Sequence, residues 1–420
     1  MNDPLEYYTK QLETYRLEEQ KRGKHIILLS TLRVLVFITV GFAIYILFDY
    51  WQLAALVGLT GVILFTYLLS KYSNVKKERA FYKELIKINE EEITILSGSF
   101  YHRNKGLEFQ EAHHFYSADI DLFGHGSFFQ YINRTTISEG TMKLAEALKV
   151  NDISNIKLRQ EAIKELSSKP QWRQHYAGTS SLVSVETSAQ NIISWLLKHK
   201  SFLPGIMRWL PVSFGIISLV ILGLTIFNII DQSWIGYWLL VGLAVTGIYL
   251  RKINELSSSC DKVKGTFRQY ASLLNQIENE IFSSKELQEK QNQIKSNGKK
   301  VSLIFKEFSK SLDALDNRNN LISAIFGNGL FLLDLKNSYK VEKWISEHAN
   351  KVSDWFEVVS FFDAYNSLGN FAFNHPEGVF PEIIKNGPVI NATQLGHPLL
   401  NKTKRVDSDL LIDNEQFFIV

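Results

Sequence analysis

The sequence predicts a mainly α-helical membrane protein, with two transmembrane helical hairpins and a helical cytoplasmic body. Of its 420 residues, 45% are hydrophobic and 21% are charged, which suits a chain that is partly soluble and partly embedded. Four nearly uncharged apolar runs occur in two pairs, and only three or four residues separate the runs of each pair. Elsewhere, apolar residues recur at three- and four-residue steps, the spacing of amphipathic helices.

Residues 1–31 are predicted to form an N-terminal cytoplasmic helix. The stretch Pro4–Lys24 is polar and favours helix, and Tyr7, Leu12, Tyr15 and Leu17 give it an imperfect apolar stripe. A signal peptide fits poorly, because the apolar run starts late and no small-residue cleavage site follows it.

Residues 32–70 and 205–250 are predicted to be the two membrane hairpins. Their apolar runs lie near Leu32–Phe48, Leu53–Ser70, Trp209–Ile230 and Trp234–Leu250. Runs of about 17–22 residues are long enough to cross a hydrocarbon layer as helices. The alternative is four buried helices of a large soluble core, but the pairing and the near absence of charge favour a membrane.

Basic residues predict the orientation of the hairpins. The two tight turns contain no Lys or Arg, whereas the outer flanks are rich in both, so we expect both termini and the soluble body in the cytoplasm. The protein would then be a multi-pass protein of the inner (cytoplasmic) membrane, in contact with lipid. The flanking basic residues are Arg22, Lys24, Lys71, Lys76, Lys77, Arg79, Lys198, Lys200, Arg208, Arg251 and Lys252.

Residues 71–204 are predicted to be helical around one irregular segment, with helices near Val75–Leu96, Asn151–Leu166 and Ser188–His199. In the irregular segment, an extended approach at Ala118–Phe123 ends at two glycines that permit a tight turn. By themselves these features describe a packing corner between helices.

Two capping boxes follow this turn. In Ser127-x-x-Gln130 and Thr136-x-x-Glu139, the hydroxyl would accept a free amide of the first helical turn and the third residue would reach back. They predict that helices begin in quick succession, near Phe128–Asn133 and Ile137–Leu148.

The same segment resembles the start of the core domain of the MutS family of DNA mismatch repair ATPases. Ile156–Leu166 resembles the helix that follows in that family, and Asp363–Phe373, Pro381–Ile383 and Gly396–Leu400 resemble the run into its nucleotide-binding domain. The resemblance covers roughly residues 85–420 and implies a structural role for the core motif. The motif residues are Asp119, Asp121, Leu122, Phe123, Gly124, Ser127, Asn133, Arg134, Thr135 and Gly140.

Residues 251–373 are predicted to form long helices, near Ile253–Asn297, Lys300–Leu315, Asn319–His348 and Lys351–Ala372. Apolar residues such as Phe305, Phe308 and Leu312 recur at helical spacing. Such helices suit an α-solenoid, a coiled coil or the lever arms of a MutS-like core.

Residues 374–420 are predicted to be a short β-containing segment, because prolines and short apolar pieces replace the helices. In the family, a strand such as Gln416–Val420 leads into the Gly-rich phosphate loop of a P-loop ATPase domain. No G-x-x-x-x-G-K-[ST] occurs in this sequence. We therefore expect no catalytic or cofactor-binding residue here, and ATP and Mg²⁺ binding only in a longer version of the chain.

Other candidate sites are few. Lys299, Lys300, Lys306 and Lys310 form a basic helical edge that could contact nucleic-acid phosphates or could be a solvated face. Neither His113–His114 nor the single Cys260 predicts a metal site, and one cysteine excludes an intramolecular disulfide.

The resemblance implies ATP-dependent binding of double-stranded DNA of the mismatch-repair type, and we also expect a homodimer. In such proteins, the nucleotide state moves lever helices that open or close a clamp on DNA. Here, a mismatch-recognition domain is lacking and the apolar hairpin Trp209–Leu250 interrupts the core. The alternative is a non-enzymatic membrane scaffold that uses the lever helices to dimerise or to hold a partner. A transporter is a weaker alternative, because the apolar runs carry no midplane ionisable pair.

Overall fold

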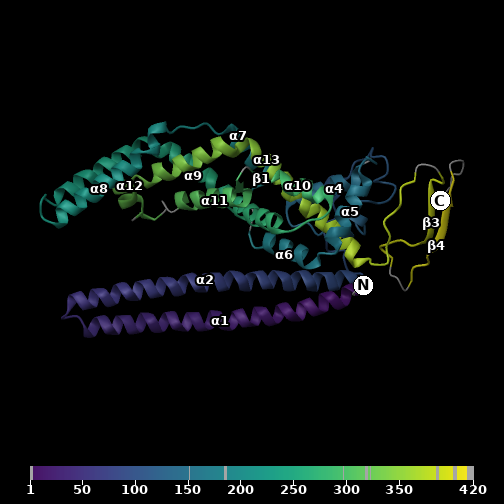
Figure 1. Ribbon diagram of the computed structural model, residues 1–420, viewed down its shortest axis with the longest axis horizontal. Coiled ribbons are helices and arrows are strands. Elements are labelled where there is room, and N and C mark those ends of the chain that lie inside the picture. Colours follow the sequence, from purple (N-terminus) through teal and green to yellow (C-terminus); the bar gives the residue numbers. More distant parts are fainter. Residues whose placement is uncertain are drawn as a thin grey trace. The chain divides into compact units, whose positions relative to one another are not determined.

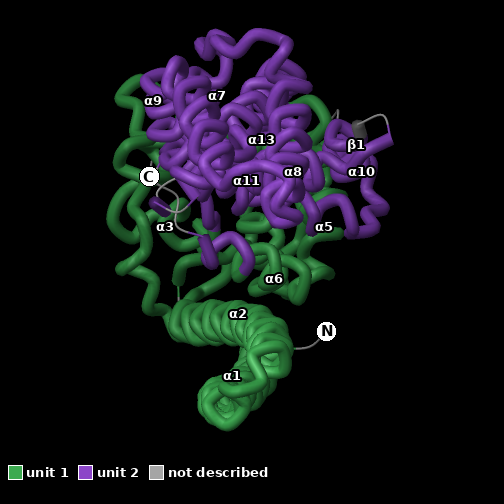
Figure 2. The backbone as a smooth tube through the Cα atoms, turned by 90° about the vertical axis from the view of Figure 1, so that its left-hand side faces the viewer, with its two compact units in different colours: residues 1–134, 144–178, 366–420 green, residues 135–143, 179–365 purple. Residues whose placement is uncertain are grey.

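The computed structural model describes residues 3–150, 152–183, 187–296, 298–316, 320–321, 323–384, 387–400 and 404–413. It is 73% helix and 4% strand, which confirms the mainly α prediction. The chain forms two compact units built from interleaved segments (Figure 2). Unit 1 comprises residues 1–134, 144–178 and 366–420, and unit 2 comprises residues 135–143 and 179–365.

Unit 1 is built on two long antiparallel helices, α1 (Pro4–Ile46) and α2 (Trp51–Leu96), which lie side by side in Figure 1. The Asp3 side chain caps α1 by accepting the amide of Leu5. In the apolar half the helices approach closely, because a Cβ atom on Gly61 would lie 2.6 Å from Val40 Cγ1. Small residues allow such close approach between membrane helices.

The polar halves of α1 and α2 are joined by surface ion pairs. Arg22 Nε lies 2.6 Å from Glu78 Oε2, and Arg79 Nε lies 2.7 Å from Glu19 Oε1. Pairs this exposed contribute about 0–1 kcal/mol each, so they set the register of the two helices more than their stability.

The predicted stretches Pro4–Lys24 and Val75–Leu96 are helical, but they are not separate helices. Each continues without a break into the neighbouring apolar run, because no Pro or Gly cluster interrupts the helical pattern. In α1, no residue of the most apolar 18-residue window is buried. In α2, only 11% of the corresponding window is buried. Protein packing therefore does not cover these apolar surfaces, contrary to what a soluble core would require.

Shorter elements complete unit 1. Pro170 starts the helix α6, an element that the sequence does not predict. Two antiparallel C-terminal strands, with a register irregularity between Ala392 and Leu395, confirm the β-containing segment, while the expected strand Gln416–Val420 lies outside the described residues. These elements are η1 (Leu107–Phe109), α3 (Phe128–Ile132), α5 (Ile156–Ser167), α6 (Pro170–Ser181), β3 (Ile390–Leu395) and β4 (Ser408–Ile412), and α4 (Ser138–Lys149) begins in unit 2 and ends in unit 1.

Unit 2 contains the second pair of apolar helices, α8 (Leu210–Ile226) and α9 (Ser233–Asn279), and the long helix α13 (Leu333–Asn374), which passes into unit 1 at Asn366. The expected helix Ile253–Asn297 is wrong, because α9 ends at Asn279 and a new helix begins at Lys285. The expected break between His348 and Lys351 is absent from α13. The remaining elements are α7 (Ala189–Lys198), η2 (Gly205–Arg208), α10 (Lys285–Gln293), β1 (Lys295–Ser296), β2 (Lys299–Lys300), α11 (Val301–Asp316), η4 (Ser323–Gly327) and α12 (Asn328–Phe331).

The core of unit 2 is aromatic and joins α9, α11 and α13. Phe308 stacks on Trp344 with ring centroids 3.8 Å apart, and Phe267 packs edge-on to both. Phe305 and Leu312 are also buried, as their helical spacing predicts. Aromatic packing of this kind adds about 0.5–1.5 kcal/mol per pair beyond burial of apolar area. We call Phe267, Phe308 and Trp344 the aromatic base of unit 2.

Among the described residues, three helices, α1, α2 and α9, are long and apolar enough to cross a membrane. The fourth apolar helix, α8, has 17 residues and so a length of ~25 Å. It pairs with α9 beyond a short turn, and Phe214 of α8 stacks on Trp238 of α9 at 4.4 Å between ring centroids.

Candidate functional site

A buried polar cluster in unit 1 joins five parts of the chain. Its centre is the carboxylate of Glu92, near the end of α2 and far beyond the apolar run that ends at Ser70. We call it the Glu92 cluster, and its members are Tyr8 from α1, Glu92 from α2, Arg134 from the segment after α3, Arg173 from α6, and Asn370 and Asn374 from α13.

Both oxygens of Glu92 are fully engaged. Arg134 donates from Nε to Oε1 at 2.6 Å and from Nη2 to Oε2 at 3.4 Å. The side-chain amides of Asn370 and Asn374 donate to Oε1 and Oε2 respectively, each at 3.0 Å. Because Glu92 is only 3% exposed, these four bonds replace the hydration that the charge has lost.

The other members of the cluster, Tyr8 and Arg173, bind the side-chain oxygens of the asparagines, whose NH₂ groups bind Glu92. The Tyr8 hydroxyl lies 2.8 Å from Asn374 Oδ1 and 3.2 Å from Asn370 Oδ1. Arg173 donates from Nη1 to Asn370 Oδ1 at 2.5 Å and from Nε to the carbonyl of Leu166 at 2.9 Å, while its Nη2 has no hydrogen-bond partner. The cluster thus buries two guanidinium groups around one carboxylate.

Electrostatics keep the Glu92 cluster ionised. Burial raises the pKa of Glu92, but attraction and a hydrogen bond from Arg134, with hydrogen bonds from Asn374 and Asn370, outweigh it, so the net pKa lies below its usual value. Burial lowers the pKa of Arg173, which shows the cost of holding a second cation there. A carboxylate with every lone pair committed is a structural centre and has no free site for proton transfer.

The sequence motif supplies one member of this cluster. Arg134 also donates its backbone amide to Ser367 Oγ at 3.0 Å and Nη1 to the carbonyl of Tyr131 at 2.7 Å, so it fixes the end of α3 on α13. Asn133 is buried, and its carbonyl accepts a bond of 2.6 Å from Arg103 Nη2. These two residues therefore help to hold the end of α3 in place.

The first half of the motif forms a turn and not the extended approach that was expected. Asp119 and Asp121 are exposed, and Asp121 has a left-handed φ of 46°. Leu122 and Phe123 are buried, and Gly124 follows with a φ of 116°, which favours glycine. The turn allows Leu122 to bury its side chain directly after the exposed residues Asp119, Ile120 and Asp121.

Of the two expected capping boxes, only the serine half of the first is present. Ser127 Oγ accepts the amide of Gln130 at 3.1 Å and starts α3 as expected, although Gln130 Oε1 reaches the amide of Gly126. The Thr136-x-x-Glu139 box is absent: the Thr136 hydroxyl donates to Asp363, and Glu139 accepts the amide of Ala189 at 2.6 Å.

In unit 2, a carboxylate from the long helix replaces this second capping box. Asp363 of α13 accepts the amides of Thr136 and Ile137 at Oδ2, at 2.9 and 3.1 Å, and the Thr136 hydroxyl at Oδ1, at 2.9 Å. The motif glycine Gly140 packs against this carboxylate. A larger residue would clash there, because a Cβ atom on Gly140 would lie only 2.0 Å from Asp363 Oδ2. The neighbouring motif residue Thr135 is half-buried, with its hydroxyl 2.6 Å from that of Thr141.

We predict that Gly140→Ala destabilises unit 2 by about 1–3 kcal/mol, the usual cost of overpacking, because the new methyl group displaces the Asp363 carboxylate from the amides that it caps. Thermal unfolding of the detergent-solubilised protein measures this change. Gly247→Ala is the matched control, because a Cβ atom at that helical glycine meets nothing within 4 Å. Equal stability of the two variants would contradict the prediction.

The predicted basic edge lies in unit 2 and is only partly free. Lys299 Nζ is 2.5 Å from Glu307 Oε2, and Lys300 Nζ is 2.5 Å from Asn279 Oδ1. Lys306 and Lys310 are exposed on α11. Glu307 therefore offsets the charge of Lys299, whereas the contact with Asn279 leaves the charge of Lys300 unchanged.

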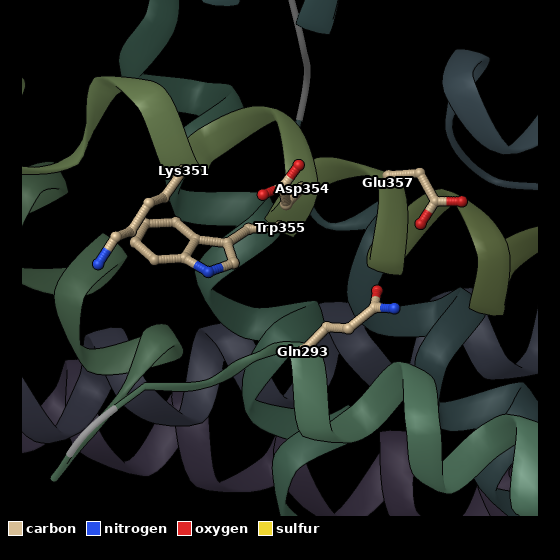
Figure 3. Close-up of a pocket in the computed structure, with 5 residues that line it drawn as sticks. All are labelled: Gln293, Lys351, Asp354, Trp355 and Glu357. Carbon is tan, nitrogen blue, oxygen red and sulfur yellow. The ribbon is translucent and has the colours of Figure 1, made fainter.

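Neither a metal centre nor a nucleotide pocket stands out among the described residues. No group of three or more His, Cys, Asp or Glu side chains there could hold a metal ion. A cavity of about 570 Å³ in unit 2 is lined by Gln293 from α10 and four residues of α13, including Trp355 (Figure 3). Its charged residues are Lys351, Asp354 and Glu357, and Glu357 is paired with Lys290 at 2.9 Å, so the mixed lining favours no class of ionic ligand.

The sequence does not single out six members of the buried polar sites, namely Tyr8, Glu92, Arg173, Asn370, Asn374 and Asp363. One signal was available, because Asn366, Asn370 and Asn374 recur every fourth residue and place amides on one face of an otherwise apolar helix end. Comparison with known proteins adds no identity: no protein-family model, curated protein or solved structure matches the chain.

Proposed function

We propose that this chain is the membrane-anchored core and lever region of a MutS-like protein that binds double-stranded DNA under the control of ATP. The observation that carries the proposal is the position of the motif residues. Arg134 binds Glu92 and the end of α13 in unit 1, and Gly140 packs against Asp363 of α13 in unit 2. A motif that holds a 42-residue helix at two points suits a core that moves a lever.

We further propose that α1, α2, α8 and α9 form four transmembrane helices, with both termini and the soluble parts in the cytoplasm. Support comes from the uncovered apolar surfaces of the three long helices and from the basic residues on the outer flanks of both pairs. The inner membrane is the proposed location, and a homodimer is the proposed assembly.

ATP and Mg²⁺ would act on a nucleotide-binding domain that begins with residues 374–420. The intact mass of the protein, extracted from its own membranes, tests this part. A mass well above 48.3 kDa would support an ATPase domain after Val420. A mass of 48.3 kDa would exclude ATP hydrolysis in cis and would favour the alternative below.

DNA binding is tested with the native protein in lipid nanodiscs and a duplex labelled with a fluorophore. We predict that Lys306→Glu/Lys310→Glu weakens binding of all duplex sequences and lowers the slope of log K against log salt by about 2, because each lysine that contacts a phosphate displaces about one counterion. Lys262→Glu/Lys340→Glu is the matched control, because it makes the same charge change at exposed positions of α9 and α13. Equal loss in both variants would place the contact elsewhere, and salt-independent binding would contradict the DNA proposal.

The second candidate function is a non-enzymatic membrane scaffold that dimerises or holds a protein partner. A specific observation favours it, because Glu307 and Asn279 already engage two lysines of the basic edge. Salt-insensitive capture of a second copy of the chain, with no binding of DNA at any salt concentration, would support this candidate over the first.

A further inference from the structure

A second apolar element of unit 2 lies between α11 and α13. The sequence is uncharged from Asn319 to Leu333. We call Leu321 together with residues 323–332 the apolar tip, which contains η4 and α12. An apolar stretch of 10–14 residues is too short to span a bilayer and is typical of a buried core helix or of a re-entrant segment.

The apolar tip packs against the middle of α8 and α9, and α12 lies beside both helices in Figure 1. Ser218, the central residue of α8, donates its hydroxyl to the carbonyl of Leu330. Gly242 lies at the centre of the apolar run Trp234–Leu250, and a Cβ atom there would lie 2.3 Å from the carbonyl oxygen of Gly329. The backbones of α9 and α12 therefore meet with no side chain between them.

The irregular backbone of the tip is sheltered. Leu332 has a left-handed φ of 49° and is fully buried, and the Asn328 side chain accepts the amide of Asp334 at 2.8 Å. Gly329 is covered by Leu239. Non-helical backbone at membrane depth is tolerated only where protein covers it, and this tip meets that condition.

The outer side of the tip is apolar and uncovered. Leu321 is 73% exposed and Phe326 is 53% exposed, whereas Asp334, the first charged residue after the tip, is 5% exposed. Both ends of the tip return to the aromatic base, where Phe308 of α11 stacks on Trp344 of α13. The tip therefore enters and leaves on the same side.

From this geometry we infer that the apolar tip is a re-entrant membrane element, which reaches the depth of the central residues of α8 and α9 and exposes Leu321 and Phe326 to lipid acyl chains. The inference rests on the proposed membrane insertion of α8 and α9. The membrane part of unit 2 is then three elements, in which the tip closes one side of the helical pair.

Spin-label accessibility in nanodiscs tests the inference. The label is attached at Phe326→Cys in the tip, and at two exposed reference positions, Leu219→Cys of α8 and Leu303→Cys of α11. Cys260 stays in place, because it is 2% exposed and burial raises its pKa to about 12, so it is a poor target for the thiol reagent. Unlabelled wild-type protein confirms this background.

We expect the ratio of collisions with oxygen to collisions with a water-soluble nickel chelate to be as high at position 326 as at 219, and lower at 303. A ratio at 326 that equals the one at 303, while 219 stays high, overturns the re-entrant element and leaves the hairpin intact. Low ratios at all three positions overturn membrane insertion of α8, and the inference with it.

Discussion

Replacing Glu92 with glutamine should destabilise the protein by about 3–5 kcal/mol, the usual cost of removing one partner of a buried ion pair. Glutamine keeps the shape of the side chain but removes the only charge that compensates Arg134 and Arg173 within the Glu92 cluster. The loss is measured as the free energy of unfolding in denaturant of the detergent-solubilised protein.

Glu90→Gln is the matched control, two residues earlier on α2. Its carboxylate pairs with Arg16 at 2.6 Å, but both side chains are about half exposed, so the control should cost at most about 1 kcal/mol. A Glu92→Gln variant as stable as Glu90→Gln would mean that the cluster is not a structural centre of unit 1.

The Glu92 prediction has a definite dependence on pH. The pKa of Glu92 is lower in the folded protein than its usual value of 4.5, so the unfolded chain binds more protons in acid. The stability that ionised Glu92 contributes is complete above about pH 4.5 and is lost as the pH falls through the lower folded pKa. Wild-type protein should therefore lose its advantage over Glu92→Gln in acid and keep it at neutral pH.

Local signals predicted the elements whose causes are local. Ser127 marks the start of α3, and the spacing of Phe305, Phe308 and Leu312 identifies the buried face of α11. The apolar runs identify the long helices, because length and hydrophobicity need no knowledge of tertiary contacts.

The polar sites could not be predicted, because their partners are distant in sequence. Glu92 meets Asn370 across 278 residues, and Asp363 caps Thr136 across 227 residues. A glutamate on a helix is usually solvated, and only the fold shows that this one is buried. The sequence predicts the apolar tip as part of the lever-like helix Asn319–His348, because only Gly327 and Gly329 mark the break.

Replacing Asp363 with alanine should cost about 2–6 kcal/mol, because it leaves the half-buried amide of Thr136 and the buried amide of Ile137 without an acceptor, at about 1–3 kcal/mol for each. Asp363→Asn is the matched control: its amide oxygen can still accept both backbone amides, and its NH₂ group can donate to the Thr136 hydroxyl. The free energies of unfolding of the two variants measure the difference, and an equal loss in both would contradict this account of the cap.

The stability that Asp363 contributes to unit 2 should also depend on pH, and comparing wild-type protein with Asp363→Asn measures this dependence. Burial raises the pKa of Asp363 from 3.8 to about 7, although the donors Thr136 and Ile137 oppose the shift. Between these values the folded protein binds more protons than the unfolded chain, so wild-type stability should fall relative to Asp363→Asn as the pH rises from 4 to 7, by about 1.4 kcal/mol per unit at most. A wild-type protein that gains stability over Asp363→Asn in this range would show that the three donors outweigh burial and keep the carboxylate ionised.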